Sequence, residues 1–527
     1  MHVHRLSGTA SSTSTRRRPD SVSPSTPIRR ASSAPVHVGS STPWTAAVWG
    51  LLIVLCGALF LDGLDISMVG VALPSIGADL HLSAGSLQWI VSGYVLGYGG
   101  LLLLGGRTAD LLGRRPVFLI AVAVFGTASL VSAALSDPTA LIALRFIKGA
   151  AAAFTVPAGL SIITTTFAEG PARSRALSIY TVCGASGFSL GLVFGGVLTE
   201  LGWRATFLLP GPVALALLVV GLRVIPRAAR QRVTFAHFDI AGALTSTAAL
   251  LVLVYAVVSA PRRGWASPST IGLLAASVIS AVLFVLIERR HPRPLVRLGI
   301  LRSATLVHAN LAGAVMFGGY VSFQFIVTLY LQNSLDWSPI AMAMGFLPAG
   351  LLVVASATRM DSVLERVDTA KLILFGLLAF VAGYALFLRV GPGMSYVNFL
   401  LPTMLLLGLG FALCFPAVNS QATAGVADDE QGLASGLVNT SIQIGRAVVL
   451  AVITAVIGTG TAAPGQPLPN MSTAIAVVVG VSSVGVVLTV ARLASQRRSA
   501  RRTTPERVVG VPAPSVEPEL VGCAETV

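Results

Sequence analysis

Long apolar runs repeat along almost the whole chain, and they restrict the fold more than any other feature of the sequence. Five of the runs contain no charged residue: 82–106, 116–136, 176–199, 240–261 and 264–287. A helix needs about 20 consecutive apolar residues to cross a hydrocarbon core of roughly 30 Å. The runs are continuous and do not alternate between apolar and polar residues, so they predict membrane-spanning helices and exclude a β-barrel.

The apolar runs and the charged or Pro/Gly-rich connections between them predict fourteen spans. The spans are expected near residues 45–70, 84–105, 116–136, 140–167, 176–199, 205–223, 240–260, 267–287, 304–332, 339–358, 372–389, 397–424, 432–458 and 472–492. Only 11% of the residues are charged, against about a quarter in soluble proteins, which agrees with lipid as the solvent. The predicted fold class is therefore all-α and integral to a membrane.

Basic residues cluster in alternate connections. If the N-terminus lies in the cytoplasm, the tails and the cytoplasmic connections hold 29 of the 36 Lys and Arg residues. Cytoplasmic loops of membrane proteins carry such an excess, so we expect both termini in the cytoplasm. Residues 1–43 and 495–527 are too poor in apolar residues to fold alone and are predicted to be disordered tails. This distribution explains the net charge of +15 without a nucleic acid as partner.

Motifs for covalent chemistry are missing from the sequence. It contains no Gly-x-Ser-x-Gly, no His-Glu-x-x-His and no phosphate-binding loop, and its four cysteines lack the spacing of a metal site. We therefore expect neither an enzyme nor a bound metal or cofactor. The missing phosphate-binding loop also argues against a nucleotide as the energy source.

A short basic connection follows the second predicted span. It reads Gly-Arg-Thr-Ala-Asp-Leu-Leu-Gly-Arg-Arg at 106–115. Glycine permits a tight turn, and the acidic residue can pair with a neighbouring Arg or cap a helix. Charged pairs at such a hinge can lock one face of a helix bundle and release it again. The predicted cytoplasmic gate consists of Gly106, Asp110, Gly113, Arg114 and Arg115.

This connection resembles the signature loop of the major facilitator superfamily, G-x-L-A-D-x-x-G-R-[RK]. Residues 64–74 resemble L-D-x-T-x-V-N-V-A-L-P, the first-helix motif of the fourteen-helix drug:proton antiporters in that superfamily, with Gly70 in place of the usual Asn. Residues 145–149 resemble R-x-x-Q-G of the fourth helix, with Lys148 in place of Gln. Together with weaker matches, the resemblance extends over roughly residues 45–490.

The fifth predicted span carries regularly spaced glycines. Residues 187–196 resemble the antiporter signature G-x-x-x-G-P-x-x-G-G, with Leu192 where Pro is usual. Small residues at every fourth position let another helix approach closely, so tight packing also explains the pattern. The glycines of this predicted antiporter helix are Gly187, Gly191, Gly195 and Gly196.

The resemblance implies the major facilitator fold, in which two six-helix halves are joined by two extra central helices. The halves would be residues 44–225 and 304–494, and the extra helices with their linkers would be residues 226–303. It also implies alternating-access export of drugs or antibiotics across a bacterial cell membrane, in exchange for protons. The implied partners are the small-molecule substrate, protons and the lipid bilayer, with the proton gradient as the energy source.

Few ionisable residues fall inside the predicted spans, so each of them is a candidate for function. Asp62 and Asp65 lie late in the first span. Arg145 and Lys148 lie early in the fourth, so both pairs are expected in the outer third of the membrane. We take Asp65 as the proton-coupling carboxylate, with Arg145 as its charge partner and Asp62 beside it. A static ion pair that ties the two helices together is the alternative.

Another cation, Arg446, lies midway along the thirteenth predicted span, where the family usually has a small residue. We expect it either to contact an anionic or polar substrate, or to pair with backbone carbonyls and hydroxyls of its neighbours. Other polar residues of apolar helices are candidates to line a substrate cavity between the halves: Tyr94, Lys148, Tyr330, Gln332 and Asn419.

Two other functions fit the same sequence. A metabolite uniporter or proton symporter would share the fold, but the fourteen spans and the partial antiporter signature favour an exporter. A membrane sensor or scaffold that does not transport is disfavoured because the sequence shows no appended signalling domain. No residue identifies the substrate, so neutral, anionic and cationic compounds all remain open.

Overall fold

The computed structural model describes residues 44–167, 170–227, 239–291, 296–390, 395–426, 431–458 and 466–503. Fourteen helical segments among these residues are long and apolar enough to cross a membrane, which confirms the predicted number. All of them belong to one compact unit, residues 37–527. The predicted N-terminal tail and residues 504–527 of the C-terminal tail lie outside the described residues.

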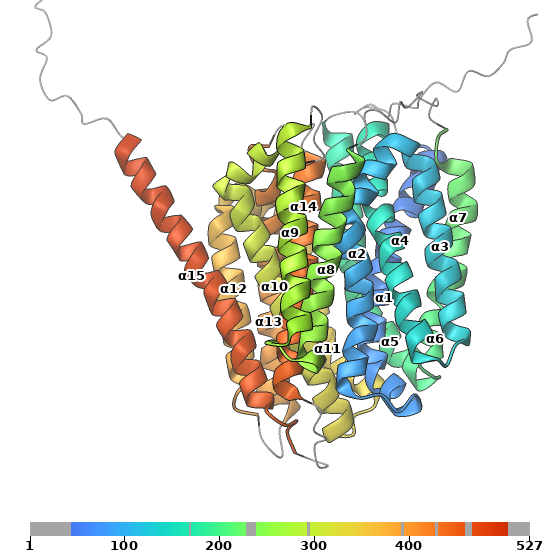
Figure 1. Cartoon of the computed structure of the whole chain (residues 1–527), viewed down its shortest axis with the longest axis vertical. Helices are drawn as coiled ribbons and strands as arrows, with labels where there is room; N and C mark the ends of the chain where they lie inside the picture. Colours follow the sequence, from blue (N-terminus) through green and yellow to red (C-terminus); the bar gives the residue numbers. More distant parts are fainter. Residues whose placement is uncertain are drawn as a thin grey trace, which may run out of the picture. The chain divides into compact units, whose positions relative to one another are not determined.

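Figure 1 labels the helices that form the spans, numbered along the chain. The N-terminal half contains α1 (Ala46–Asp79), α2 (Ala84–Leu112), α3 (Arg114–Ala134), α4 (Pro138–Thr166), α5 (Pro171–Glu200), and α6 (Arg204–Leu208) with α7 (Pro210–Val224), which together form one span. The extra pair is α8 (Ile240–Arg263) and α9 (Pro268–Arg290). The C-terminal half contains α10 (Ala304–Leu329), α11 (Pro339–Arg366), α12 (Thr369–Phe387), α13 (Leu401–Thr423), α14 (Gln431–Ile457) and α15 (Met471–Thr503).

Both halves pair their helices in the same order. In the N-terminal half, α1 packs on α5, α2 packs on α4, and α3 packs on α4 and α7. In the C-terminal half, α10 packs on α14, α11 packs on α13, and α12 packs on α13 and α15. The second pattern repeats the first helix by helix, as expected for two copies of one six-helix unit. The fold is thus the predicted pair of six-helix halves with two extra helices.

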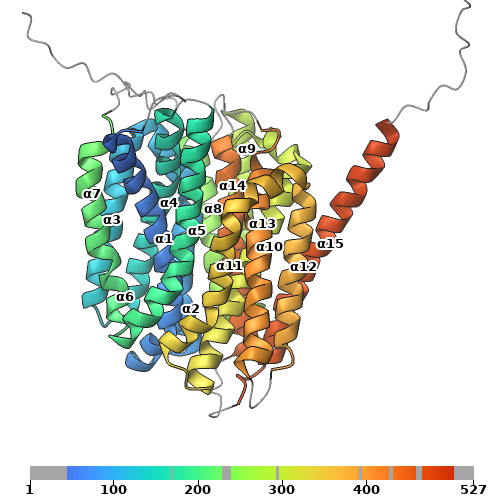
Figure 2. The same ribbon diagram turned by 180° about the vertical axis from the view of Figure 1, so that it is seen from behind.

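Two seams join the halves. At one seam α2 packs against α14, and at the other α5 packs against α11. Figure 1 is seen from the side of the α2–α14 seam and Figure 2 from the side of the α5–α11 seam. α8 contacts both α2 and α14, and α9 packs on α8. The extra helices therefore cover the α2–α14 seam.

We call the end of the bundle at which α1 begins the terminal end, and the end at which α1 finishes the distal end. An even number of spans brings the chain back to the terminal end. At the distal end, one apolar core combines Ile76 and Leu192 of the N-terminal half with Leu331 and Met342 of the C-terminal half. At the terminal end, the apolar residues of the N-terminal half form a separate core. The halves are therefore joined by a common apolar core at the distal end.

Four predicted span ends are wrong: α2 and α11 continue to Leu112 and Arg366 instead of ending near residues 105 and 358, and α1 and α15 differ most. α1 continues to Asp79 instead of ending near residue 70, because its last turns, with Pro74 inside them, are buried against protein. Asp62 and Asp65 consequently lie near the middle of α1, and their predicted place late in the span does not hold. α15 continues to Thr503, so residues 495–503 of the predicted tail are helical.

Candidate functional site

The charged residues of α1 and α4 form one buried cluster. Asp65 accepts a hydrogen bond from Arg145 on one carboxylate oxygen and from Lys148 on the other. None of the three side chains is more than 2% exposed. Arg145 Nε also donates to the carbonyl oxygen of Ile90 on α2, at 3.0 Å. The structure thus brings Asp65 together with Arg145, as the sequence suggested, and adds Lys148 as a second cation.

Lys148 is enclosed within the N-terminal half. Its ammonium lies 4.8 Å from the ring centre of Phe125 and 5.4 Å from that of Phe207. A cation over an aromatic face is attracted by the ring quadrupole, and more strongly so without water. The expected place of Lys148 in a cavity between the halves is therefore wrong, because its contacts lie on α1, α3 and α6.

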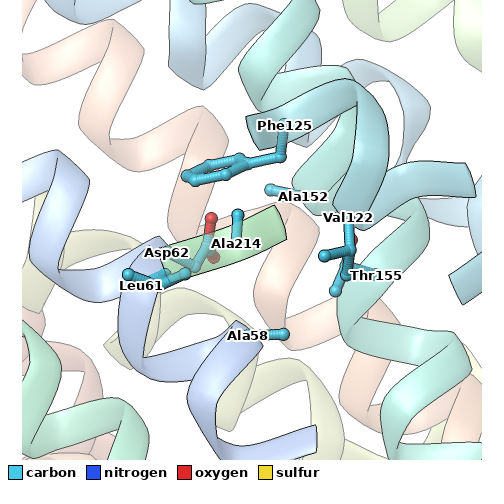
Figure 3. A pocket seen from close by; sticks show the side chains of 8 residues that line it. All are labelled: Ala58, Leu61, Asp62, Val122, Phe125, Ala152, Thr155 and Ala214. Atoms are coloured by element: carbon cyan, nitrogen blue, oxygen red, sulfur yellow. The ribbon is translucent and has the colours of Figure 1, made fainter. Parts of the chain in front are cut away.

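Asp62 has different surroundings from Asp65, although the two are one turn apart. It accepts a hydrogen bond from the hydroxyl of Tyr94 and forms no ion pair within the described residues. Its side chain lines a small cavity between α1, α3, α4 and α7 (Figure 3). The other lining residues are Ala58, Leu61, Val122, Phe125, Ala152, Thr155 and Ala214. The cavity has room for about one water molecule and lies inside the N-terminal half.

The two carboxylates of α1 have partners of different charge. At Asp65, both oxygens are engaged by cations, which hold the carboxylate in its charged form. At Asp62, the partner is neutral and the carboxylate faces space that a water molecule can occupy. A proton can therefore be added to Asp62 without breaking an ion pair.

Arg446 lies on α14 at the α2–α14 seam and is 6% exposed. Its Nη1 donates to Oε1 of Gln443 at 3.2 Å, and its guanidinium carbon lies 4.4 Å from the ring centre of Phe317. Its Nε has no hydrogen-bond partner in the described part of the chain. The partners of Arg446 are thus a carboxamide and an aromatic ring, and the expected carbonyl and hydroxyl contacts are not among its described bonds.

The remaining cavity candidates do not converge on one space. The hydroxyl of Tyr94 donates a hydrogen bond to Asp62, inside the N-terminal half. Gln332 Nε2 donates to the carbonyl of Val71 at 3.0 Å, which links the halves at the distal end. Tyr330 is fully buried in the same distal region, and Asn419 donates to the carbonyl oxygen of Phe415, on its own helix. Hydropathy predicts which residues are in a helix but not which way each helix is turned, so it cannot show that these side chains face different parts of the bundle.

The glycines of α5 lie at helix contacts. A Cβ atom added at Gly187, Gly191 or Gly195 would come within 3 Å of backbone atoms of α1. A Cβ added at Gly196 would lie 2.6 Å from the Cβ of Ala343, on α11. Three of the predicted antiporter glycines therefore hold α5 against α1, and the fourth holds it against the other half.

The described contacts of the predicted gate connection, residues 106–115, are with helices of the N-terminal half. Gly113 adopts a φ of 95°, a conformation that favours glycine, and so separates α2 from α3. Gly106 lies against Pro157 of α4, and Arg114 begins α3. Arg115 Nη2 donates to the carbonyl of Leu222 on α7 at 2.7 Å. The side chain of Asp110 lies outside the described residues, so the described bonds of the connection tie α3 to α7.

Sequence reasoning missed Gln443, Phe317 and Gln324. Gln443 is three residues before Arg446, a spacing that places both on one helix face and was a usable signal. Gln324 lies opposite Gly70, where its Nε2 would be 3.4 Å from an added Cβ. No sequence signal connected it or Phe317 with the buried charges, because both contacts cross between helices that are far apart in the sequence.

The comparisons with known proteins agree with this architecture. Residues 55–450 match the model of the Major Facilitator Superfamily. The chain is 38% identical to the puromycin resistance protein of Streptomyces alboniger, over 79% of this chain and 82% of that protein. It is 34% identical to the cephamycin export protein of Amycolatopsis lactamdurans, over 92% and 99% of the two chains.

A solved peptide transporter has the same fold with a TM-score of 0.64, over 85% of this chain and 95% of that one, at 17% identity. The family match covers most of the chain, and the fourteen apolar helices make it a multi-pass membrane protein. The chain belongs to the major facilitator superfamily and is therefore a membrane transporter, not an enzyme, with relatives that are named for antibiotic resistance and export.

Proposed function

We propose that this transporter exports small molecules, drugs or antibiotics among them, in exchange for protons across the bacterial cell membrane. The names of the relatives in Streptomyces and Amycolatopsis support export of antibiotics. The excess of Arg in the connections of the terminal end supports a cytoplasmic position for both termini.

The contrast between Asp62 and Asp65 carries the proposal. Asp65 is held by Arg145 and Lys148 and ties α1 to α4. Asp62 has a neutral hydroxyl partner and faces a cavity of about one water molecule. We therefore assign proton binding to Asp62 and a positioning role to Asp65, which reverses the expectation from the sequence. An ionisable residue without an ion-pair partner inside a membrane is expensive, so it is a strong candidate for function.

Alternating access supplies the second part of the mechanism. The common apolar core and the bond from Gln332 to Val71 hold the halves together at the distal end. With the termini in the cytoplasm, this conformation is closed to the outside. Opening to the outside requires the α5–α11 contact at Gly196 to separate, while the terminal end closes. A proton taken up by Asp62 from outside and released inside would drive this cycle.

Inverted membrane vesicles provide the test. Respiration acidifies their interior, a pH-sensitive dye reports the stored protons, and a panel of antibiotics and dyes is added from outside. We expect one or more compounds to release protons with the wild type and none to do so with Asp62→Asn. Asp79→Asn, at the surface of the distal end, serves as the control and retains exchange.

Two results would contradict the proposal. Undiminished exchange by Asp62→Asn would remove Asp62 from the proton site. A folded wild type that moves compounds of the panel down their gradients but never in exchange for protons would be a uniporter.

A further inference from the structure

Arg446 is the buried cation of the α2–α14 seam, and its hydrogen bonds within the described residues include no carboxylate. Arg145 and Lys148 share Asp65, whereas the single hydrogen bond of Arg446 within the described residues goes to Gln443. A guanidinium has five N–H donors in a planar fork. Most of these donors are therefore available to another acceptor, and Nε is buried without any partner in the described part of the chain.

An aromatic row leads from Arg446 across the bundle. Phe317 lies under the guanidinium and packs edge to face against Phe411, with ring centres 5.4 Å apart. Phe411 contacts Tyr320, and Tyr320 contacts Phe188 of α5, with ring centres 5.7 and 5.8 Å apart. The row therefore joins α10 and α13 of one half to α5 of the other. Aromatic rings on both sides of a seam are suited to hold a flat ring system between them.

A second donor lies on the same face of α10. Gln324 follows Phe317 by seven residues, which is two helical turns. Its side chain is 6% exposed, and its Nε2 has no hydrogen-bond partner in the described part of the chain. Gly70 of α1 leaves the space that this amide occupies, at the position where the family usually has Asn. Two buried donors from the C-terminal half thus lie along one row of rings.

The charges buried midway along the spans disfavour a positively charged substrate, since the other two buried carboxylates, Asp239 and Glu288, lie at the terminal ends of α8 and α9. The spans of α1, α4 and α14 hold Asp62 and Asp65 against Arg145, Lys148 and Arg446. The sum is +1 with both carboxylates ionised and +2 once Asp62 has bound a proton. Lys148 and Arg446 both depart from the family pattern, and both add positive charge. A positively charged substrate would therefore be repelled in either state of Asp62.

An anionic substrate would bind together with the proton, whereas exchange requires the two to bind alternately. An anion bound at Arg446 would add negative charge to the same water-poor interior that holds Asp62, and so would favour binding a proton along with it. An uncharged substrate avoids both the repulsion and this coupling.

We propose that Arg446, Gln324 and the aromatic row from Phe317 to Phe188 form the substrate site, and that it takes uncharged, flat aromatic compounds with oxygen acceptors. Arg446 and Gln324 donate hydrogen bonds to the oxygens, and the rings stack on the aromatic frame. This inference rests on the proposed exporter function and names the class of substrate for it.

Three probes with one ring system test the class. The probes are 6,7-dimethoxycoumarin, which is uncharged, a methoxycoumarin with an acetate group, and a methoxycoumarin with a trimethylammonium group. Their accumulation in inverted vesicles is measured by coumarin fluorescence after filtration, together with proton release. We expect the wild type to accumulate the uncharged probe with proton release and to exclude the trimethylammonium probe. A wild type that prefers either charged probe would overturn the proposal.

Variants of Arg446 test the residue. Arg446→Gln should bind the uncharged probe about ten- to a hundredfold more weakly, the usual effect of losing a hydrogen bond to a charged donor. It should also accumulate the cationic probe, a gain that a merely structural residue would not give. Arg446→Lys keeps the charge and should still exclude the cation. Arg389→Gln, an exposed Arg at the distal end, is the control and should match the wild type.

The outcomes separate the two proposals. Unchanged selectivity in a folded Arg446→Gln would overturn the site. Proton exchange with compounds of the wider panel but with none of the coumarins would overturn the substrate class and leave the exporter function intact. If the variants do not fold, the order in which the wild type accumulates the three probes still tests the proposed class of substrate. No proton exchange with any compound would contradict the exporter function itself.

Discussion

Replacing the two carboxylates of α1 one at a time should affect stability very differently. Asp65→Asn removes the negative charge between Arg145 and Lys148 and leaves both cations buried side by side. Asp62→Asn keeps an oxygen that can accept the hydrogen bond of the Tyr94 hydroxyl. Both substitutions preserve the shape of the side chain, so the difference between them measures the charge environment.

The contacts set the size of the two effects. Removing one partner of a buried ion pair costs about 3–5 kcal/mol, and the second cation at Asp65 places the loss toward the upper end. At Asp62, the loss is the difference between a charged and a neutral acceptor, about 1 kcal/mol. The variants should therefore differ by about 2–4 kcal/mol, which corresponds to roughly 2–4 °C in Tm for a chain of this length.

Thermal unfolding of the purified protein in detergent, followed by intrinsic fluorescence, measures this difference. The double variant Asp65→Asn with Lys148→Gln removes one of the two stranded cations and should recover part of the lost Tm. Equal losses for Asp62→Asn and Asp65→Asn would refute the reasoning, and so would a double variant that is no more stable than Asp65→Asn.

The glycine contacts of α5 give two further predictions. Gly191→Ala puts a Cβ 2.6 Å from the carbonyl oxygen of Leu64 and should cost about 1–3 kcal/mol with slower transport, whereas Gly272→Ala meets nothing within 4 Å and should leave Tm nearly unchanged. Equal Tm values for these two variants would show that the α1–α5 contact can relax. A Cβ at Gly350 lies 3.1 Å from that of Ser189, so cysteines at both positions, without the native cysteines, should cross-link the halves on oxidation and stop transport until reduced. Full transport by the cross-linked protein would contradict a separation of α5 from α11.

The sequence predicted the spans well because lipid imposes the pattern directly. Each crossing must be a helix of about 20 apolar residues, so composition alone reveals it. The end of α1 could not be predicted in this way. Its last turns, including Val71 and Ile76, are buried against other helices, so packing inside the protein determines where α1 ends.

The sequence predicted which charged residues lie in the buried site, but not which partner each of the two carboxylates would bind. Asp62 and Asp65 are three residues apart, a spacing that predicts one common helix face. The rotation of about 60° between them is enough to turn Asp65 toward Arg145 and Lys148, and Asp62 toward Tyr94. Which partner each carboxylate meets depends on how α2 and α4 are turned about their axes. Nearly uniform apolar helices carry little information on that rotation.

The position of α8 has a mechanical consequence. α8 contacts α2 of one half and α14 of the other, so at least one of these contacts must slide whenever the halves rock. The side chains that meet there include Val95, Val254, Val258 and Ala447, which interact by dispersion and without directional bonds. Such a contact can be displaced by a fraction of a turn and re-form at every intermediate position. α8 therefore keeps the two halves aligned as they move, and its apolar contacts add only a small energy barrier to that movement.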